Sequence, residues 1–188
     1  MVSEVLLGQE TIEMRVEQLA QQIQNDYQGK GDLVLVCVLK GAFVFCSDLA
    51  RHLTMPVEFE FVAVSSYGND TVSSGEVKIE LPFADRSGKN FKGKHLLIVE
   101  DILDSGRTAE VLIKFLHTYK PSSVAFSALL RKPTNLKFPI NVDYLGFDIP
   151  DKYVIGHGLD YAGKFRNWPS IGVLDTSLVT RGGSKYGE

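Results

Sequence analysis

Residues 100–108 bring together side chains whose types and spacing suit one binding task. They read Glu-Asp-Ile-Leu-Asp-Ser-Gly-Arg-Thr, with the paired acids Glu100 and Asp101 directly after an apolar run and Asp104 three residues further on. Carboxylates bind sugar hydroxyls and hard cations. The small turn that follows can offer the backbone N–H groups of a starting helix to a phosphate. The segment therefore predicts a site for a phosphorylated sugar carried with a divalent cation.

The same acids also have a purely structural interpretation. Asp104 and Ser105 suit the N-terminus of a helix, where acidic and hydroxylated side chains cap free N–H groups. Capping one helix needs one side chain, however, and this segment holds three carboxylates and a glycine. We therefore favour a binding site over a capping role.

Several other positions carry side chains that suit chemistry, although each also has an ordinary structural explanation. The explanations are a strand-to-helix turn, a hairpin tip, a surface lysine, a core ring, a turn acid and a surface cation. Their joint occurrence in one chain favours a functional interpretation. The positions are Lys40 and Gly41, Ser66 and Tyr67, Lys132, Tyr153, Asp160 and Arg166.

Alternating strands and helices must position these side chains. Apolar residues at helical spacing predict a helix over residues 10–26 with Thr11 as its N-cap, and valine-rich apolar runs predict buried strands. Residues 67–93 are rich in Gly, Ser, Asn and Asp, and this long excursion is predicted to be mobile and functional. The other predicted elements are strands at Leu33–Leu39, Val57–Val64, near Val77–Leu81, Leu96–Val99, Ser123–Leu130 and Val142–Phe147, and helices at Gly41–His52 and Thr108–Tyr119.

This order predicts an α/β fold with a mostly parallel sheet and helices on both faces. Ligands of such sheets bind at the C-terminal ends of the strands. We therefore expect the loops after Leu39, Val99 and Leu130 to meet at one edge and form the site.

The composition is that of an ordinary globular protein and narrows the possible partners. The chain has 188 residues, of which 44% are apolar and 23% charged, with a net charge of −3. No Lys/Arg-rich stretch or global positive field favours nucleic acid, and no apolar run is long enough for a membrane. Cys37 and Cys46 lie in apolar surroundings, which predicts buried, reduced thiols. Without a recognisable secretory signal, a cytoplasmic location is expected.

The segment Glu100–Thr108 resembles the phosphoribosyl-diphosphate (PRPP) motif of type I phosphoribosyltransferases. The resemblance implies that Glu100 and Asp101 hold the ribose hydroxyls beside Mg²⁺. It implies a catalytic role for Asp104 as general acid or base at purine N7. The residues that it implies hold PRPP are Glu100, Asp101, Asp104, Ser105, Gly106, Arg107 and Thr108.

The run from Gly146 to Gly156, with Leu159-Asp160-Tyr161 and Phe165-Arg166, closely resembles hypoxanthine-guanine phosphoribosyltransferases over roughly residues 33–174. By this resemblance Lys132 donates to the purine 6-oxo group and Tyr153 stacks on the base. A cis bond before Lys40 and a lid that begins at Ser66 and Tyr67 are also implied. The residues implied for the purine are Ile102, Lys132, Tyr153, Val154 and Asp160, those for the diphosphate are Leu39, Lys40, Gly41 and Arg166, and those for Mg²⁺ are Glu100, Asp101 and Asp160.

The family implies a type I phosphoribosyltransferase fold with a mobile active-site loop over about residues 66–93 and a small hood, in a single domain over residues 1–188. It implies PRPP and 6-oxopurine substrates and a homodimer or homotetramer. Two alternatives remain: a regulator on the same fold that senses PRPP and binds nucleic acid, and an enzyme that prefers another base such as xanthine or guanine. The pair His157-Gly158 departs from the family pattern and is expected to alter the edge of the base pocket.

Overall fold

The structure is a computed structural model that describes residues 2–66, 77–80 and 91–175. Its helices and strands alternate along most of the chain, as the sequence predicts. The elements are β1 Val2–Leu7, α1 Gln9–Tyr27, β2 Leu33–Leu39, α2 Phe43–His52, β3 Glu58–Ser66, β4 Val77–Glu80, β5 His95–Leu103, α3 Arg107–His117, β6 Ser123–Arg131, a short 3₁₀ helix Pro133–Asn135, β7 Tyr144–Asp148, β8 Val154–Ile155 and β9 Ile171–Leu174.

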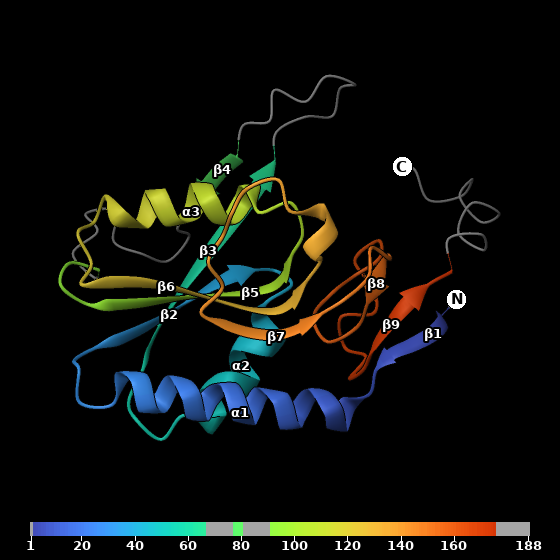
Figure 1. The fold of residues 1–188 in the computed structure, drawn as a ribbon, viewed down its shortest axis with the longest axis horizontal. Coiled ribbons are helices and arrows are strands. Elements are labelled where there is room, and N and C mark those ends of the chain that lie inside the picture. Colours follow the sequence, from blue (N-terminus) through green and yellow to red (C-terminus); the bar gives the residue numbers. More distant parts are fainter. Residues whose placement is uncertain (1, 67–76, 81–90, 176–188) are drawn as a thin grey trace.

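The larger sheet has the strand order β4-β3-β2-β5-β6-β7. Neighbouring strands from β3 to β7 pair in parallel, and β4 pairs antiparallel with β3. Figure 1 shows α1 and α2 on one face of this sheet and α3 on the other. The predicted mostly parallel sheet with helices on both faces is confirmed.

Alternation along the central strand β2 explains why two helical layers form. Every residue of β2 from Leu33 to Val38 is buried, and successive side chains point to opposite faces. One set packs with the apolar stripe of α1 and with α2, and the other packs with α3. The first set is Leu33, Leu35 and Cys37, and the second is Val34, Val36 and Val38.

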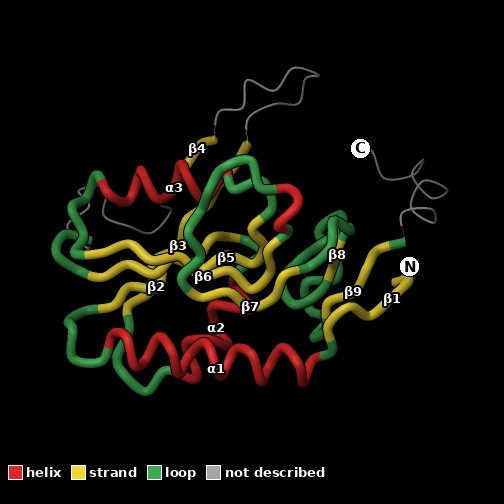
Figure 2. The backbone as a smooth tube through the Cα atoms, viewed as in Figure 1, coloured by secondary structure: helices red, strands yellow, loops and turns green. Residues whose placement is uncertain are grey.

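A second, smaller sheet forms a hood beside the C-terminal ends of the parallel strands. Its strand order is β1-β9-β8, and all its pairs are antiparallel. Figure 2 shows these short strands set apart from the main sheet, with β1 from the start of the chain against β9 from near its end. The hood is the small additional unit that the family resemblance implied.

Several predicted element boundaries differ from the structure by a few residues, and two of the differences have a clear cause. Helix α1 begins at Gln9 rather than after Thr11, because the carbonyl of Gly8 already accepts the N–H of Ile12. Strand β5 extends beyond Val99 to Leu103, since its pairing with β6 continues past the apolar run. The acids of residues 100–101 therefore stand on a strand rather than in a loop.

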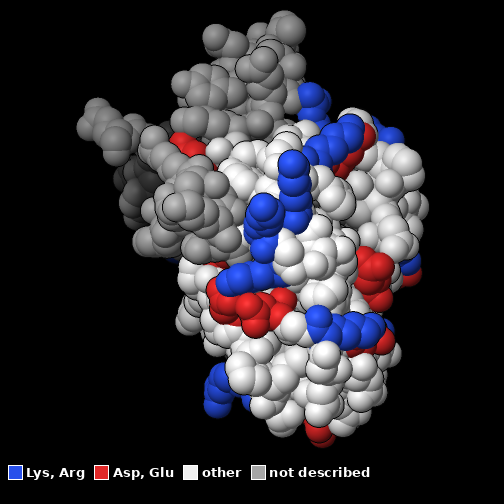
Figure 3. Space-filling view, turned by 90° about the vertical axis from the view of Figure 1, so that its left-hand side faces the viewer, with Lys and Arg blue, Asp and Glu red and all other residues white. Residues whose placement is uncertain are grey.

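The predicted strand near Val77–Leu81 is confirmed as β4, and Ser66 ends β3. Tyr67 and most of the segment over residues 66–93 lie outside the described residues, so the lid stays a prediction. Cys37 and Cys46 are buried free thiols, as expected. No helix in the described part of the chain is long and apolar enough to cross a membrane. On the side away from the hood, Figure 3 shows acidic and basic side chains interspersed.

Candidate active site

The acids Glu100 and Asp101 lie near the C-terminal end of β5, where the main sheet meets the hood. Burial raises the pKa of Glu100 well above its usual value, and the neighbouring charge of Asp101 adds to this effect. One carboxylate oxygen of Glu100, Oε2, is buried without a hydrogen-bond partner. Burial also raises the pKa of Asp101, although the charge of Arg166 acts in the opposite direction. Two crowded carboxylates with an unsatisfied oxygen call for a cation or hydroxyl donors.

The loop after β2 packs directly against this acid pair. The Leu39–Lys40 peptide bond is cis, as the resemblance implied, and Lys40 is exposed. The Cα of Gly41 lies so close to the carboxylate of Asp101 that a Cβ atom at this position would overlap it. The close approach requires glycine here and places the backbone of the loop beside the acids.

The turn after β5 forms a phosphate-sized recess at the N-terminus of α3. Gly106 precedes α3 with a φ of 82°, a left-handed conformation that suits glycine, and the carbonyl of Phe138 leaves no room for a side chain. The carbonyl of Ser105 accepts N–H groups from Lys137 and Phe138, which fixes the turn. The first N–H groups of α3 have no partner within the helix and can bind an anion, although that of Arg107 also donates to Ser105 Oγ at 3.4 Å. A small cavity of about 100 Å³ is lined by Glu100, Ile102, Leu103, Asp104, Ser105, Gly106, Thr108 and Ala109.

A network of four polar side chains adjoins this turn. Lys132 is buried, with only 10% of its side chain exposed, so it is no ordinary surface lysine. Its Nζ lies 3.5 Å from Asp104 Oδ2 and 3.1 Å from Asp151 Oδ1. Asn135 donates from Nδ2 to both carboxylates, at 2.9 Å to Asp104 and 2.8 Å to Asp151. The hydrogen bond that Asp151 accepts from Asn135, together with the one from Lys132, lowers the pKa of Asp151.

The remaining predicted site residues lie in the segment over residues 153–166, which contains β8 and is called the hood segment below. Tyr153 is half-exposed, its ring stands edge-to-face with Tyr161, and its hydroxyl donates to the carbonyl of Asp160 at 3.3 Å. Val154 is buried at the start of β8. Asp160 and Arg166, to which the resemblance assigns separate ligands, form an ion pair with each other at 2.6 Å.

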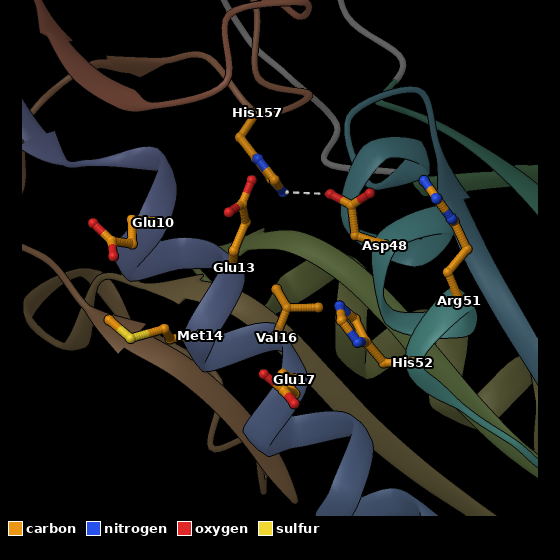
Figure 4. Close-up of a pocket in the computed structure, with 9 residues that line it drawn as sticks. All are labelled: Glu10, Glu13, Met14, Val16, Glu17, Asp48, Arg51, His52 and His157. Carbon is orange, nitrogen blue, oxygen red and sulfur yellow. Dashed lines mark ion pairs between the residues drawn. The ribbon is translucent and has the colours of Figure 1, made fainter.

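The predicted effect of the His157-Gly158 pair on the edge of the base pocket stays a prediction. The His157 side chain is buried and points into the space between α1 and α2 (Figure 4). There its Nε2 lies 3.5 Å from Asp48 Oδ2.

Comparison with known proteins agrees with this geometry. Residues 3–162 match the phosphoribosyl transferase domain. The hypoxanthine-guanine phosphoribosyltransferase of Bacillus subtilis is 43% identical over 177 residues, which cover 94% of this chain and 96% of that protein. The chain belongs to the hypoxanthine-guanine phosphoribosyltransferase family. The match also reaches beyond the resemblance read from the sequence, because it takes in the N-terminal residues that form β1.

Solved structures of the family have the same fold. Hypoxanthine phosphoribosyltransferase from Trypanosoma cruzi, solved as a ternary complex of substrates with a variant, superimposes with a TM-score of 0.85 at 38% identity and covers 95% of this chain and 98% of that one. A second structure from that organism, solved to study how the C-terminal region affects oligomeric state and activity, gives a TM-score of 0.87 at 38% identity, with coverage of 96% and 95%. These likenesses confirm the type I phosphoribosyltransferase fold and the classification as an enzyme.

The sequence did not indicate that Asn135 and Asp151 belong to the site of this family member. Asn135 ends the short 3₁₀ helix Pro133–Asn135 and Asp151 follows Pro150, and both proline-containing segments resemble ordinary turns in the sequence. The available signal was position: Asn135 follows Lys132 by three residues, and Asp151 precedes Tyr153 by two. Only the fold shows that the two segments meet across the ammonium group of Lys132.

Proposed function

We propose that this chain transfers the 5-phosphoribosyl group of PRPP to N9 of hypoxanthine, and of guanine, releasing diphosphate and forming IMP or GMP. The observation that carries the proposal is the direct link between the phosphate turn and the base network. Asp104 belongs to the turn and also lies within 3.5 Å of Lys132 Nζ. One short segment therefore contacts both partners of the reaction.

The PRPP end of the site consists of the acids, the turn and the loop after β2. Glu100 and Asp101 hold the ribose hydroxyls, and the N–H groups at the start of α3 hold the 5′-phosphate. The backbone of Leu39–Gly41 and the side chain of Arg166 hold the diphosphate. Arg166 must leave Asp160, its partner at 2.6 Å, at least in part to do so.

The acid pair fits Mg²⁺. Glu100 has a buried oxygen without a partner, and two crowded carboxylates with raised pKa values gain from a divalent cation. Among the described residues no group of three or more His, Cys, Asp or Glu side chains is placed to hold a metal by itself. This agrees with Mg²⁺ held by one or two carboxylates together with substrate oxygens, with Asp160 as a candidate for a second ion. When bound, Mg²⁺ supplies positive charge to the departing diphosphate.

The base lies between Tyr153 and the network around Lys132. The Tyr153 ring gives the purine a face to stack on, and the Val154 backbone and Ile102 bound its edge. Lys132 donates to the 6-oxo group, and because an ammonium group cannot accept, it selects against a 6-amino group. The carboxylate of Asp104 accepts the N7 proton as N9 forms its bond to carbon 1 and the bond from carbon 1 to the diphosphate breaks.

Initial rates with PRPP, Mg²⁺ and each of hypoxanthine, guanine and xanthine test this proposal. We expect one IMP and one diphosphate per hypoxanthine consumed, no product in excess EDTA, and faster turnover of hypoxanthine and guanine than of xanthine. If no nucleoside monophosphate forms with any of the three bases, the proposal is wrong.

Replacing Gly41 with Ala should weaken the binding of PRPP. The added Cβ overlaps the Asp101 carboxylate, so the loop or the acid must move. Because a displacement of about 1 Å can cost about 10²-fold in rate, we expect kcat/KM for PRPP to fall by about 10–100-fold. Gly8→Ala is the matched control, since nothing lies within 4 Å of a Cβ there. Equal PRPP kinetics in both variants would show that the loop does not contribute.

Replacing Asn135 with Leu should lower kcat/KM for the purine base and leave kcat/KM for PRPP unchanged. The change removes both N–H groups that hold Asp104 and Asp151, and hydrogen bonds to charged groups contribute about 1.5–3 kcal/mol each. We expect kcat/KM for hypoxanthine to fall about tenfold or more. Asn141→Leu, which removes a similar bond to Asp143 away from the site, is the control.

We further propose a single catalytic domain in the cytoplasm that assembles as a homodimer or homotetramer. The free, buried cysteines support the location, since such thiols persist in reducing compartments. Light scattering of the purified protein measures the assembly, and a monomer at micromolar concentration would contradict it.

A further inference from the structure

Within the hood segment, the turn Gly156–Gly158 has a backbone conformation that the proposed chemistry leaves unexplained. Its three residues all have positive φ angles, of 98°, 45° and 99°, and the middle one is His157. A residue with a side chain rarely adopts this conformation, and it persists where surrounding contacts impose it. The flanking glycines adopt it readily, so the histidine is the residue that needs an explanation.

This left-handed turn packs against the back of the diphosphate loop. Gly158 lies so close to the carbonyl of Gly41 that a Cβ atom would overlap it. The same Gly158 donates its N–H to the carbonyl of Arg166 at 2.9 Å and accepts from Arg166 Nη1 at 2.7 Å. Gly41 in turn lies against Asp101. The turn is thus in contact with both groups proposed for the diphosphate.

The His157 side chain anchors the turn to two separate parts of the fold. Its ring is buried, with 5% of the residue exposed. Nδ1 lies 3.4 Å from the carbonyl of Pro169 in the hood, and Nε2, which is buried without a hydrogen-bond partner, lies 3.5 Å from Asp48 Oδ2 on α2. Figure 4 shows the ring directed from the hood toward Asp48, with Glu13 of α1 beside it.

The position of Asp48 makes this anchor relevant to catalysis. Helix α2 begins at Phe43, two residues after Gly41, so α2 and the diphosphate loop form one continuous piece. The contact between the buried His157 ring and Asp48 therefore joins the left-handed turn to the element that carries the loop. The backbone N–H of His157 also donates to the carbonyl of Trp168 at 2.6 Å, which ties the turn to the segment after Arg166.

We propose that His157, through Asp48, is a positioning residue for the diphosphate end of the site. It holds the left-handed turn so that Gly158 supports the Leu39–Gly41 loop and orients Arg166. This inference rests on the proposed function, because it takes the loop and Arg166 as the diphosphate ligands. We therefore expect loss of the anchor to lower kcat/KM for PRPP and to leave the KM for hypoxanthine unchanged, because Lys132 and Tyr153 contact the base.

Steady-state kinetics of IMP formation in His157→Ala, His157→Gln and Asp48→Ala test the inference. In the Ala variants we expect kcat/KM for PRPP to fall by about tenfold, because a small displacement of the Leu39–Gly41 loop misplaces the diphosphate, and inhibition by diphosphate to weaken similarly. The KM for hypoxanthine at saturating PRPP should stay within about twofold. His157→Gln keeps an N–H donor and should recover part of the loss.

Glu17→Gln and His52→Ala are matched controls, because both residues line the same cavity in Figure 4 and neither contacts the turn. We expect them to match the wild type. Unchanged PRPP kinetics in both Ala variants, or an equal loss for PRPP and hypoxanthine, would overturn the inference. If His157→Ala does not fold, Asp48→Ala decides, since Asp48 is partly exposed. A wild-type protein that forms no IMP would refute the proposed function and this inference together, whereas an active wild type with unaffected variants refutes the inference alone.

Discussion

Replacing Asp104 with Asn should lower turnover by about 10²–10⁴-fold, the usual contribution of a positioned general acid or base, while PRPP affinity changes little. The Asp104 carboxylate is held by Asn135 at 2.9 Å and faces Lys132 at 3.5 Å, so its orientation is set before substrates bind. An amide keeps the shape but loses the negative charge that accepts a proton. Turnover from steady-state rates and PRPP affinity from calorimetry separate the two effects.

The control for this charge removal is Glu110→Gln. Glu110 lies on α3, close in sequence to the turn, and its side chain pairs with the exposed Lys114 at 2.8 Å. Exposed pairs of this kind contribute little. We expect wild-type turnover in the control. Unchanged turnover in Asp104→Asn would remove the residue from the chemistry.

Replacing Lys132 with Ala should relax the discrimination between 6-oxo and 6-amino purines. Lys132 is the buried cation of the network, and it reaches both Asp104 and Asp151. Its loss removes the donor to the 6-oxo group and leaves two carboxylates bridged by Asn135 alone. A hydrogen bond from a charged group contributes about 1.5–3 kcal/mol, so we expect kcat/KM for hypoxanthine to fall about 10–150-fold.

Competition between hypoxanthine and adenine measures this effect. Adenine has no 6-oxo group that accepts from Lys132, so the rate with adenine should not fall with the loss of this donor. Lys114→Ala, which removes an exposed lysine on α3, serves as the control. A Lys132→Ala variant that keeps the wild-type preference for hypoxanthine would contradict the assigned contact.

The sequence predicted the parts of the site that are local in the chain. Residues 100–108 bring acids and a phosphate turn together within nine positions, so no knowledge of tertiary structure is needed to find them. The buried strands were equally clear, because β2 is apolar on both faces. Its predicted end at Leu39 placed Lys40 and Gly41 correctly at the edge of the sheet.

Features that depend on pairing between distant segments were missed. Strand β1 is short and mostly exposed, and it becomes a strand by pairing with β9 about 170 residues away. Strand β5 was predicted too short, because Glu100 and Asp101 interrupt its apolar run and only pairing with β6 shows that it continues to Leu103. Asn135, Asp151 and the orientation of His157 depend on how loops from different strands meet, which periodicity does not reveal.

The most direct test of the account is the structure of this protein with bound IMP. The central claim is that the segment Glu100–Thr108 holds the phosphorylated sugar while its Asp104 faces the base. We expect the 5′-phosphate at the N–H groups of the turn that starts α3, purine N7 facing Asp104, and the 6-oxo oxygen about 3 Å from Lys132 Nζ. A phosphate bound away from this turn, or a base out of reach of Asp104 and Lys132, would contradict the account.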